Sequence, residues 1–245
     1  MTGAAASKQF AVLDEAQEAQ HVTGGRLILP DPLNAAHARL SAAQPVRTYA
    51  LSVDRETLKQ AAAEGRLCWR AYERALNLTG AAERVTLSGA VLSGVPRRQV
   101  LRVAEQYAPQ APELLRLYAA DCAELVQEAG KSHAPVIAAA VTAARAWAVS
   151  GEADPDAQAA VRGALCDVLT VHDDLQGVTA AVRCAVLALH PDPGTAAQGG
   201  NFTAHHLGRT LAAAQFQSGN ARARVLGDVD RALSLILARY DAGAA

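Results

Sequence analysis

From Glu113 onward, apolar residues recur at three- and four-residue intervals within stretches rich in alanine. One such stripe contains Leu114, Leu117, Cys122 and Leu125, and this spacing is typical of a helix with one buried face. Alanine accounts for 57 of the 245 residues and is the best helix former, whereas aromatic residues, which favour strands, make up only 4%. Each apolar stripe can be buried only against a neighbouring helix. The sequence therefore predicts a mainly α protein in which residues 110–245 form an antiparallel α-helical bundle.

The helices expected in this bundle are separated by proline and glycine signals. They are Glu113 to Val126, Pro135 to Trp147, Pro155 to Leu189, Thr203 to Gln217 and Arg222 to Tyr240. Residues 191–194 (PDPG) indicate a stop, and residues 199–201 (GGN) are interpreted as a loop that leads to a helix N-cap. Trp69, Trp147 and Cys122 are expected in the core.

The N-terminal part has a different pattern. We expect residues 1–25 to form a loosely ordered arm and residues 26–109 to form a small α+β domain. Its expected elements are strands at Arg26 to Leu29 and Val46 to Val53, a helix over Thr57 to Leu76 with Asp54 as its N-cap, and a helix from Pro96 to Tyr107. The stretch from Arg84 to Gly94 fits either a strand or a helix.

The charge distribution and the cysteine content bear on the roles of the two parts of the chain and on its cellular compartment. The net charge is −1, but residues 44–110 carry 10 Lys and Arg against 6 Asp and Glu, whereas residues 111–245 carry 10 against 14. This asymmetry suggests divided roles. The four cysteines form no CxxC pair, and the sequence contains neither a signal peptide nor an apolar run of membrane-spanning length. We therefore expect a cytoplasmic protein with reduced thiols that does not enter a membrane.

Residues 86–103 (TLSGAVLSGVPRRQVLRV) resemble the helix-turn-helix of bacterial DNA-binding proteins. Ala90, Gly94 and Val100 have the spacing of the small residue at the helix crossing, the turn glycine and the apolar anchor of the second helix. Val95 and Val103 suit the flanking buried positions. The resemblance implies a plain or winged helix-turn-helix with a recognition helix from Pro96 to Gln106. Its expected DNA-contacting residues are Arg97, Arg98, Gln99 and Arg102.

A second resemblance extends over residues 117–208. The strings LYAADCAEL (117–125), AARAWA (143–148), SGE (150–152) and AHHLG (204–208) are similar, in order and spacing, to the alanine-rich helical immunity proteins of bacterial toxin systems. This resemblance implies a module that binds a protein partner without catalysis.

A third, shorter string is VHDDLQG at residues 171–177. It resembles half of the aspartate-rich motif of trans-prenyl synthases, in which carboxylates one helical turn apart hold Mg²⁺ against a diphosphate. Gly177 replaces the third aspartate, and the chain has no second motif of this kind. The alternative is a buried His172 on the apolar stripe, with Asp173 and Asp174 facing water.

The sequence contains none of the common catalytic or nucleotide-binding motifs, and the adjacent His205 and His206 would point about 100° apart on a helix. We therefore expect a non-enzymatic protein without a metal or cofactor. The leading hypothesis is a DNA-binding protein whose bundle provides dimerisation or partner contact. An immunity-like protein-binding module is the alternative, and an isoprenoid-type Mg-dependent enzyme is the third. A homodimer is expected, because alanine-rich stripes often complete their burial on a second copy.

Overall fold

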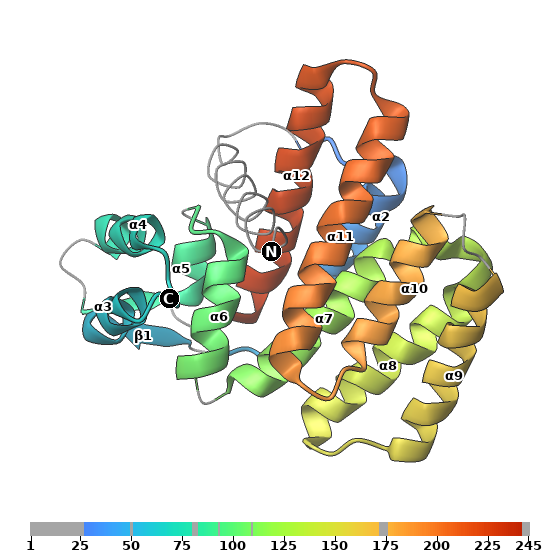
Figure 1. Ribbon diagram of the computed structural model, residues 1–245, viewed down its shortest axis with the longest axis horizontal. Coiled ribbons are helices and arrows are strands. Elements are labelled where there is room, and N and C mark those ends of the chain that lie inside the picture. The colour runs from blue at the N-terminus through green and yellow to red at the C-terminus, as the bar shows by residue number, and fades with distance from the viewer. Residues whose placement is uncertain are drawn as a thin grey trace, which may run out of the picture.

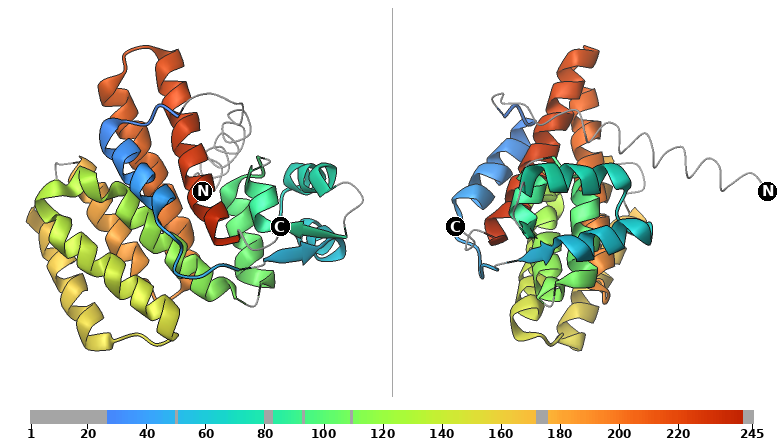
Figure 2. Two further views of the ribbon diagram at one scale, coloured as in Figure 1. Left: turned by 180° about the vertical axis from the view of Figure 1, so that it is seen from behind. Right: turned by 90° about the vertical axis from the view of Figure 1, so that its left-hand side faces the viewer.

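The computed structural model of the chain describes residues 27–49, 51–79, 83–92, 94–108, 110–171 and 176–241. It confirms a mainly α fold, in which a bundle of long helices lies beside a smaller part made of short helices and two short strands (Figures 1 and 2). The expected arm, residues 1–25, lies outside the described residues, and so do His172, Asp173 and Asp174.

The bundle is built around one central helix. Its elements are α7 (Ala111–Val126), the 3-10 helix η1 (Gln127–His133), α8 (Ala134–Ser150), α9 (Pro155–Val171), α10 (Gln176–Ala188), α11 (Pro193–Gln215), α12 (Gly219–Ala238) and the 3-10 helix η2 (Arg239–Asp241). Thirteen of the 16 residues of α7 are buried, because α8, α10 and α11 pack around it. The apolar stripe expected from Leu114 to Leu125 therefore lies at the centre of the molecule.

Small residues allow α7 and α11 to pack closely. A Cβ atom added to Gly200 of α11 would lie 3.4 Å from Cβ of Cys122 and 3.6 Å from Cα of Ala119. This contact explains one wrong prediction. Residues 199–201 are part of a continuous helix that begins at Pro193 with Asp192 as its N-cap, and they do not form a loop. Close packing against α7 outweighs the low helix propensity of glycine.

The prediction of a single helix from Pro155 to Leu189 is also wrong, because the chain forms two helices there, α9 and α10. These two helices pack against each other, and α10 also packs against α7 and α11. Apolar residues keep the same spacing through both helices. Helical periodicity alone therefore could not indicate the reversal of direction.

The N-terminal part is divided more finely than expected. Its elements are α2 (Asp31–Ala42), β1 (Ser52–Asp54), α3 (Arg55–Ala63), α4 (Trp69–Thr79), β2 (Arg84–Thr86), α5 (Leu87–Leu92) and α6 (Arg97–Tyr107). β1 pairs antiparallel with β2, with Val53 opposite Val85. The stretch that fitted either a strand or a helix contains both, β2 followed by α5.

The helix expected over residues 57–76 is interrupted. Asp54 is its N-cap, as expected, and accepts a hydrogen bond from the backbone N–H of Thr57 at 2.8 Å. The helix ends at Ala63, and Gly65 follows with φ +72°. This left-handed conformation favours glycine, and so Gly65 was the available signal for the interruption.

Helix α2 was not predicted, and residues 27–30 form no strand although one was expected there. Leu33 and Leu40 are buried, because α2 packs across α7 and not against the small sheet (Figure 2). An acidic residue and a proline in the first turn, Asp31 and Pro32, are typical of a helix start and could have indicated this helix.

The end of the described chain fastens the N-terminal segments to the bundle. Asp241 in η2 accepts hydrogen bonds from the backbone N–H groups of Leu51, at 3.0 Å, and of Ser88, at 2.9 Å. Asp228 of α12 accepts another from the N–H of Ile28 at 2.5 Å. Buried residues of both parts form one continuous hydrophobic cluster. A domain boundary at residues 109 and 110 therefore stays a prediction.

Candidate functional site

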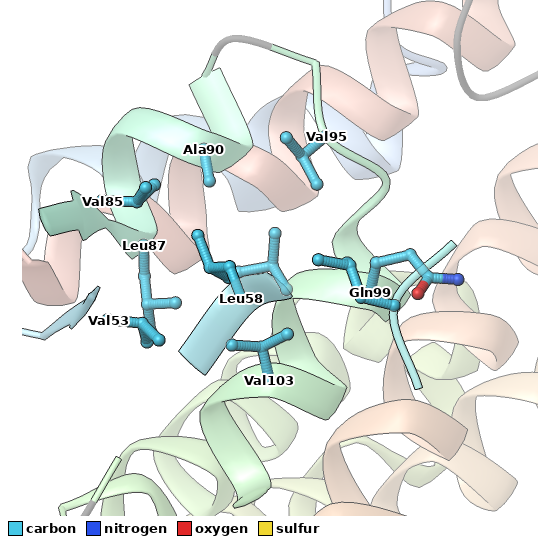
Figure 3. A pocket seen from close by; sticks show the side chains of 10 residues that line it. Val53, Leu58, Val85, Leu87, Ala90, Val95, Gln99 and Val103 are labelled. Carbon is cyan, nitrogen blue, oxygen red and sulfur yellow. The ribbon is translucent and has the colours of Figure 1, made fainter. Parts of the chain in front are cut away.

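The stretch predicted to be a helix-turn-helix contains a turn between α5 and α6, and the helix-turn-helix itself stays a prediction. Gly94, in the turn between α5 and α6, has φ +85°, and the backbone N–H of Val95 donates to the carbonyl of Ala90 at 3.0 Å. Ala90, Val95, Val100 and Val103 line a small apolar cavity. Figure 3 shows Ala90, Val95 and Val103 around it. The cavity has a volume of about 20 Å³, about the space of one water molecule. It is a packing gap in the core of the N-terminal part.

The four residues expected to contact DNA do not share one surface. Arg97 and Gln99 are only 4% and 2% exposed. The Gln99 side-chain oxygen accepts a hydrogen bond from the backbone N–H of Cys68 at 3.3 Å. Arg98 is half-buried, and Arg102 is exposed. The expectation that all four residues line a DNA-contacting surface is therefore not met by this arrangement.

Arg97 contributes to a buried polar cluster that connects α6 with α11 and α12. Its Nη2 atom donates to Oδ1 of Asp230 at 2.7 Å, and its Nε atom donates to Oδ1 of Asn201 at 2.8 Å. The hydroxyl of Tyr118 donates to the same Asn201 oxygen at 2.8 Å. Nδ1 of His205 lies 2.9 Å from Oδ1 of Asp230. Burial disfavours the Asp230 carboxylate, but Arg97 and His205 more than offset this and hold the pKa of Asp230 below its ordinary value.

The sequence did contain a signal for the burial of Arg97. Val100, Leu101 and Ala104 lie three, four and seven residues after it, and all three are buried. Arg97 therefore occupies the apolar stripe of its own helix. An arginine on such a stripe indicates a buried ion pair more directly than it indicates a contact with DNA.

A second polar cluster surrounds Asp121, which is fully buried in α7. Its carboxylate accepts hydrogen bonds from Nη2 of Arg145 at 2.6 Å, Nη2 of Arg239 at 2.7 Å and the hydroxyl of Tyr240 at 2.6 Å. Arg145 also pairs with Glu124. Burial raises the pKa of Asp121 above its ordinary value, because the two guanidinium groups and the hydroxyl only partly offset the loss of water.

This cluster joins two of the strings that resemble the immunity proteins. Asp121 and Glu124 come from LYAADCAEL, and Arg145 comes from AARAWA. The structure places them in one ion-pair network between α7 and α8. These residues therefore link α7 to α8 inside the bundle.

A larger hollow lies where the start of α7, the end of α8 and the start of α11 meet, at the lower end of the bundle in Figure 1. We call it the Trp147 groove, and its volume is about 720 Å³. Its lining residues come from those three helix ends and the turn that follows α8: Gln110, Pro112, Glu113, Arg116, Trp147, Ala148, Val149, Ser150, Gly151 and Pro193.

The floor of the Trp147 groove is held in a fixed geometry. The guanidinium of Arg116 lies 3.3 Å from the centroid of a Trp147 ring. Its Nη1 atom donates to the carbonyl of His190 at 2.8 Å, and its Nη2 atom donates to the carbonyl of Pro191. On the wall, Glu113 pairs with Arg47 at 2.9 Å. Burial lowers the pKa of Arg116, although its charge is favoured by Asp192.

Sequence reasoning missed this groove. Trp147 was expected in the core, but it is half-buried and stacks against the more deeply buried Arg116. Trp69, the other expected core tryptophan, is 56% exposed at the start of α4, and so that prediction is wrong. Arg116 lies within an otherwise apolar run, and this was the available signal. Its stacking on a residue 31 positions away depends on how two helices pack.

The described residues also bear on metal binding and on membrane insertion. Across these ranges, no three His, Cys, Asp or Glu side chains are grouped closely enough to hold a metal ion. None of the described helices combines the length and the apolar character that crossing a membrane requires. No family model matches the sequence, and no curated protein and no solved structure matches it either.

Proposed function

We propose that the chain is a non-enzymatic protein-binding module that receives an extended segment of a partner protein in the Trp147 groove. The observation that carries the proposal is the open hollow of about 720 Å³ whose floor is a stacked arginine and tryptophan. Tryptophan and arginine are the residue types most enriched where interfaces gain their binding energy. Such a function is also what the resemblance to the helical immunity proteins implies.

The rigidity of the floor supports binding. Arg116 is 7% exposed and is held by two backbone carbonyls as well as by the Trp147 ring. Pro112 and Pro193 restrict the backbone on two sides of the groove. A surface that is already ordered loses little side-chain entropy when a partner binds. Val149, 39% exposed, adds an apolar contact at the rim.

The DNA-binding hypothesis has less support from the geometry. Of its four residues, Arg97 and Gln99 are buried in contacts within the protein. Arg102 is exposed and Arg98 is half-buried, and two side chains make a small electrostatic footprint for a duplex. DNA binding is therefore an outcome that the experiment below must be able to reveal.

Selection from a random peptide library tests the proposal. Peptides enriched on the full chain are measured against Val149→Trp, which fills part of the groove without changing charge. Leu92→Trp is the matched control, because Leu92 is 48% exposed on α5, outside the groove. We expect Val149→Trp to weaken binding about tenfold, or about 1.4 kcal/mol, and Leu92→Trp to leave it unchanged.

Two outcomes would overturn the proposal. One is a library that yields no peptide, or only peptides that bind Val149→Trp as well as the native chain. The other is a mobility shift of duplex DNA at low salt that Val149→Trp retains and that Arg98→Ala with Arg102→Ala abolishes. Light scattering on the same samples tests the expected homodimer.

A further inference from the structure

The hydrogen-bonding groups that line the Trp147 groove point to the chemistry of its occupant, and this inference rests on the proposed function. We infer that the groove selects an uncharged, proline-rich segment of a partner protein in the extended polyproline II conformation.

The first step concerns the charged side chains of the lining, which are engaged within the protein. Glu113 pairs with Arg47 at 2.9 Å. Both Nη atoms of Arg116 donate to backbone carbonyls, and Asp192 further favours its charge. A charged partner would therefore lose water here without gaining an unpaired opposite charge. The lining favours an occupant that carries no charge at the contact.

The second step concerns the hydrogen-bonding side chains that remain. The indole N–H of Trp147 has no hydrogen-bond partner among the residues that the structure describes, and it is not enclosed by the protein. The exposed side-chain amide of Gln110 has none among them either. In contrast, the Ser150 hydroxyl donates to the carbonyl of Glu152 at 2.8 Å and accepts its N–H at 3.1 Å. Because an indole N–H can only donate, it needs an oxygen acceptor from the occupant.

The third step concerns the apolar part of the lining. Pro112, Ala148, Val149 and Pro193 lie around the Trp147 ring, and Val149 is 39% exposed. Grooves that combine an aromatic ring with apolar walls are the usual receptors of proline-rich segments. The apolar side chains of the lining therefore fit the rings of prolines.

A proline-rich segment meets both requirements at once. In the polyproline II conformation its carbonyl oxygens make no internal hydrogen bonds, and each proline lacks an N–H. Such a segment offers an acceptor to Trp147 and buries few donors that would need a partner of their own. Its backbone is also restricted before binding, so it loses less conformational entropy than a flexible segment does.

The first test uses the full chain and two uncharged synthetic peptides of equal length. One is rich in proline, and in the other alanine replaces each proline. Isothermal titration calorimetry should show that the alanine peptide binds at least about tenfold more weakly. Val149→Trp should weaken binding of the proline-rich peptide, which assigns that binding to the groove.

The second test concerns the indole N–H itself. Trp147→Phe keeps an aromatic ring but removes this donor, and it should weaken binding about fivefold, as expected for one neutral hydrogen bond. Trp69→Phe is the matched control, because Trp69 is exposed on α4, outside the groove. The chain has two tryptophans, so Trp69→Phe also assigns the two indole N–H signals in the nuclear magnetic resonance spectrum of the native chain. The proline-rich peptide should shift the Trp147 signal.

Equal binding of the two peptides would overturn the inference, and so would binding that leaves the Trp147 indole signal unmoved. Library peptides that depend on the groove but contain no proline would also overturn it, while leaving the proposed function intact. A library that yields no groove-dependent peptide would remove both.

Discussion

Asp121 in α7 and Asp230 in α12 are both removed from water and both bound by arginine, yet their pKa values shift in opposite directions. Asp121 is fully buried and has three donors, whereas the side chain of Asp230 is 14% exposed and has two side-chain partners. The additional donor at Asp121 does not offset the greater loss of water. The depth of a carboxylate therefore matters as much as the number of its partners.

The largest expected effect follows from removing the deeper carboxylate. Asp121→Leu leaves the guanidinium groups of Arg145 and Arg239 without their shared partner. We expect a loss of about 4 kcal/mol in the free energy of unfolding, measured by urea denaturation. Adding Arg145→Met and Arg239→Met should recover much of this loss. A triple variant as unstable as Asp121→Leu would show that the three charges are not one unit.

The next effect is expected at the shallower cluster. Arg97→Met removes the ion pair of Asp230 and one of the two donors to Asn201, and it should cost about 3 kcal/mol of unfolding free energy. Arg102→Met on the exposed side of the same helix should change the unfolding free energy by less than about 0.5 kcal/mol. Equal, small effects at both positions would contradict the buried placement of Arg97.

Two tyrosines allow the clusters around Asp121 and Asp230 to be compared through one hydrogen bond each. Tyr240 donates to the charged Asp121 at 2.6 Å, and Tyr118 donates to the neutral Asn201 at 2.8 Å. Because bonds to charged groups are stronger, Tyr240→Phe should cost about 2 kcal/mol and Tyr118→Phe about 1 kcal/mol. Thermal and urea unfolding of both variants measures the difference. A larger loss for Tyr118→Phe would reverse the ranking of the two clusters.

The smallest expected effect is a change in how steeply the free energy of unfolding depends on pH. The folded pKa of Asp230 is lowered, so the stability that its charge contributes is present above the unfolded pKa of about 3.9 and is lost as pH falls below it. The folded pKa of Asp121 is raised, so Asp121 takes up a proton in the folded state first, and this partly offsets acid unfolding. Asp230→Asn should therefore flatten the acid limb of the stability curve, and Asp121→Asn should steepen it.

Each slope change should be at most about 1.4 kcal/mol per pH unit, since one proton is involved. Urea unfolding midpoints between pH 3 and pH 7 provide the measurement. Slope changes of the same sign in Asp230→Asn and Asp121→Asn would contradict the opposite pKa shifts of the two carboxyl groups.

Sequence reasoning succeeded where local rules decide the structure. Asp54 as an N-cap, the turn at Gly94 and the stripe along α7 follow from neighbouring residues alone. It failed where packing decides. Residues 199–201 form a helix because α7 lies against Gly200, and the reversal between α9 and α10 leaves the spacing of the apolar residues unchanged.

The candidate site follows the same rule. Arg116 and Trp147 lie on different helices, and they form one surface only when α7 and α8 pack together. Asp121 and Arg145 depend on the same pairing of helices. Arg97 differs, because its position on the stripe of α6 was visible in the sequence. Its place on that stripe predicts that Arg97 is buried and therefore does not contact DNA.

The bonds from Asp241 and Asp228 to the N-terminal segments also set an order of events during synthesis. Leu51 and Asp241 are 190 positions apart, and Ile28 and Asp228 are 200 apart. The ribosome releases Ile28 and Leu51 long before it has made the carboxylates that bind their N–H groups. Contacts this distant in the chain form late and slow the search for the native state. Until α12 and η2 emerge, the backbone N–H groups of Ile28 and Leu51 stay without these acceptors, although α2 can already pack on α7.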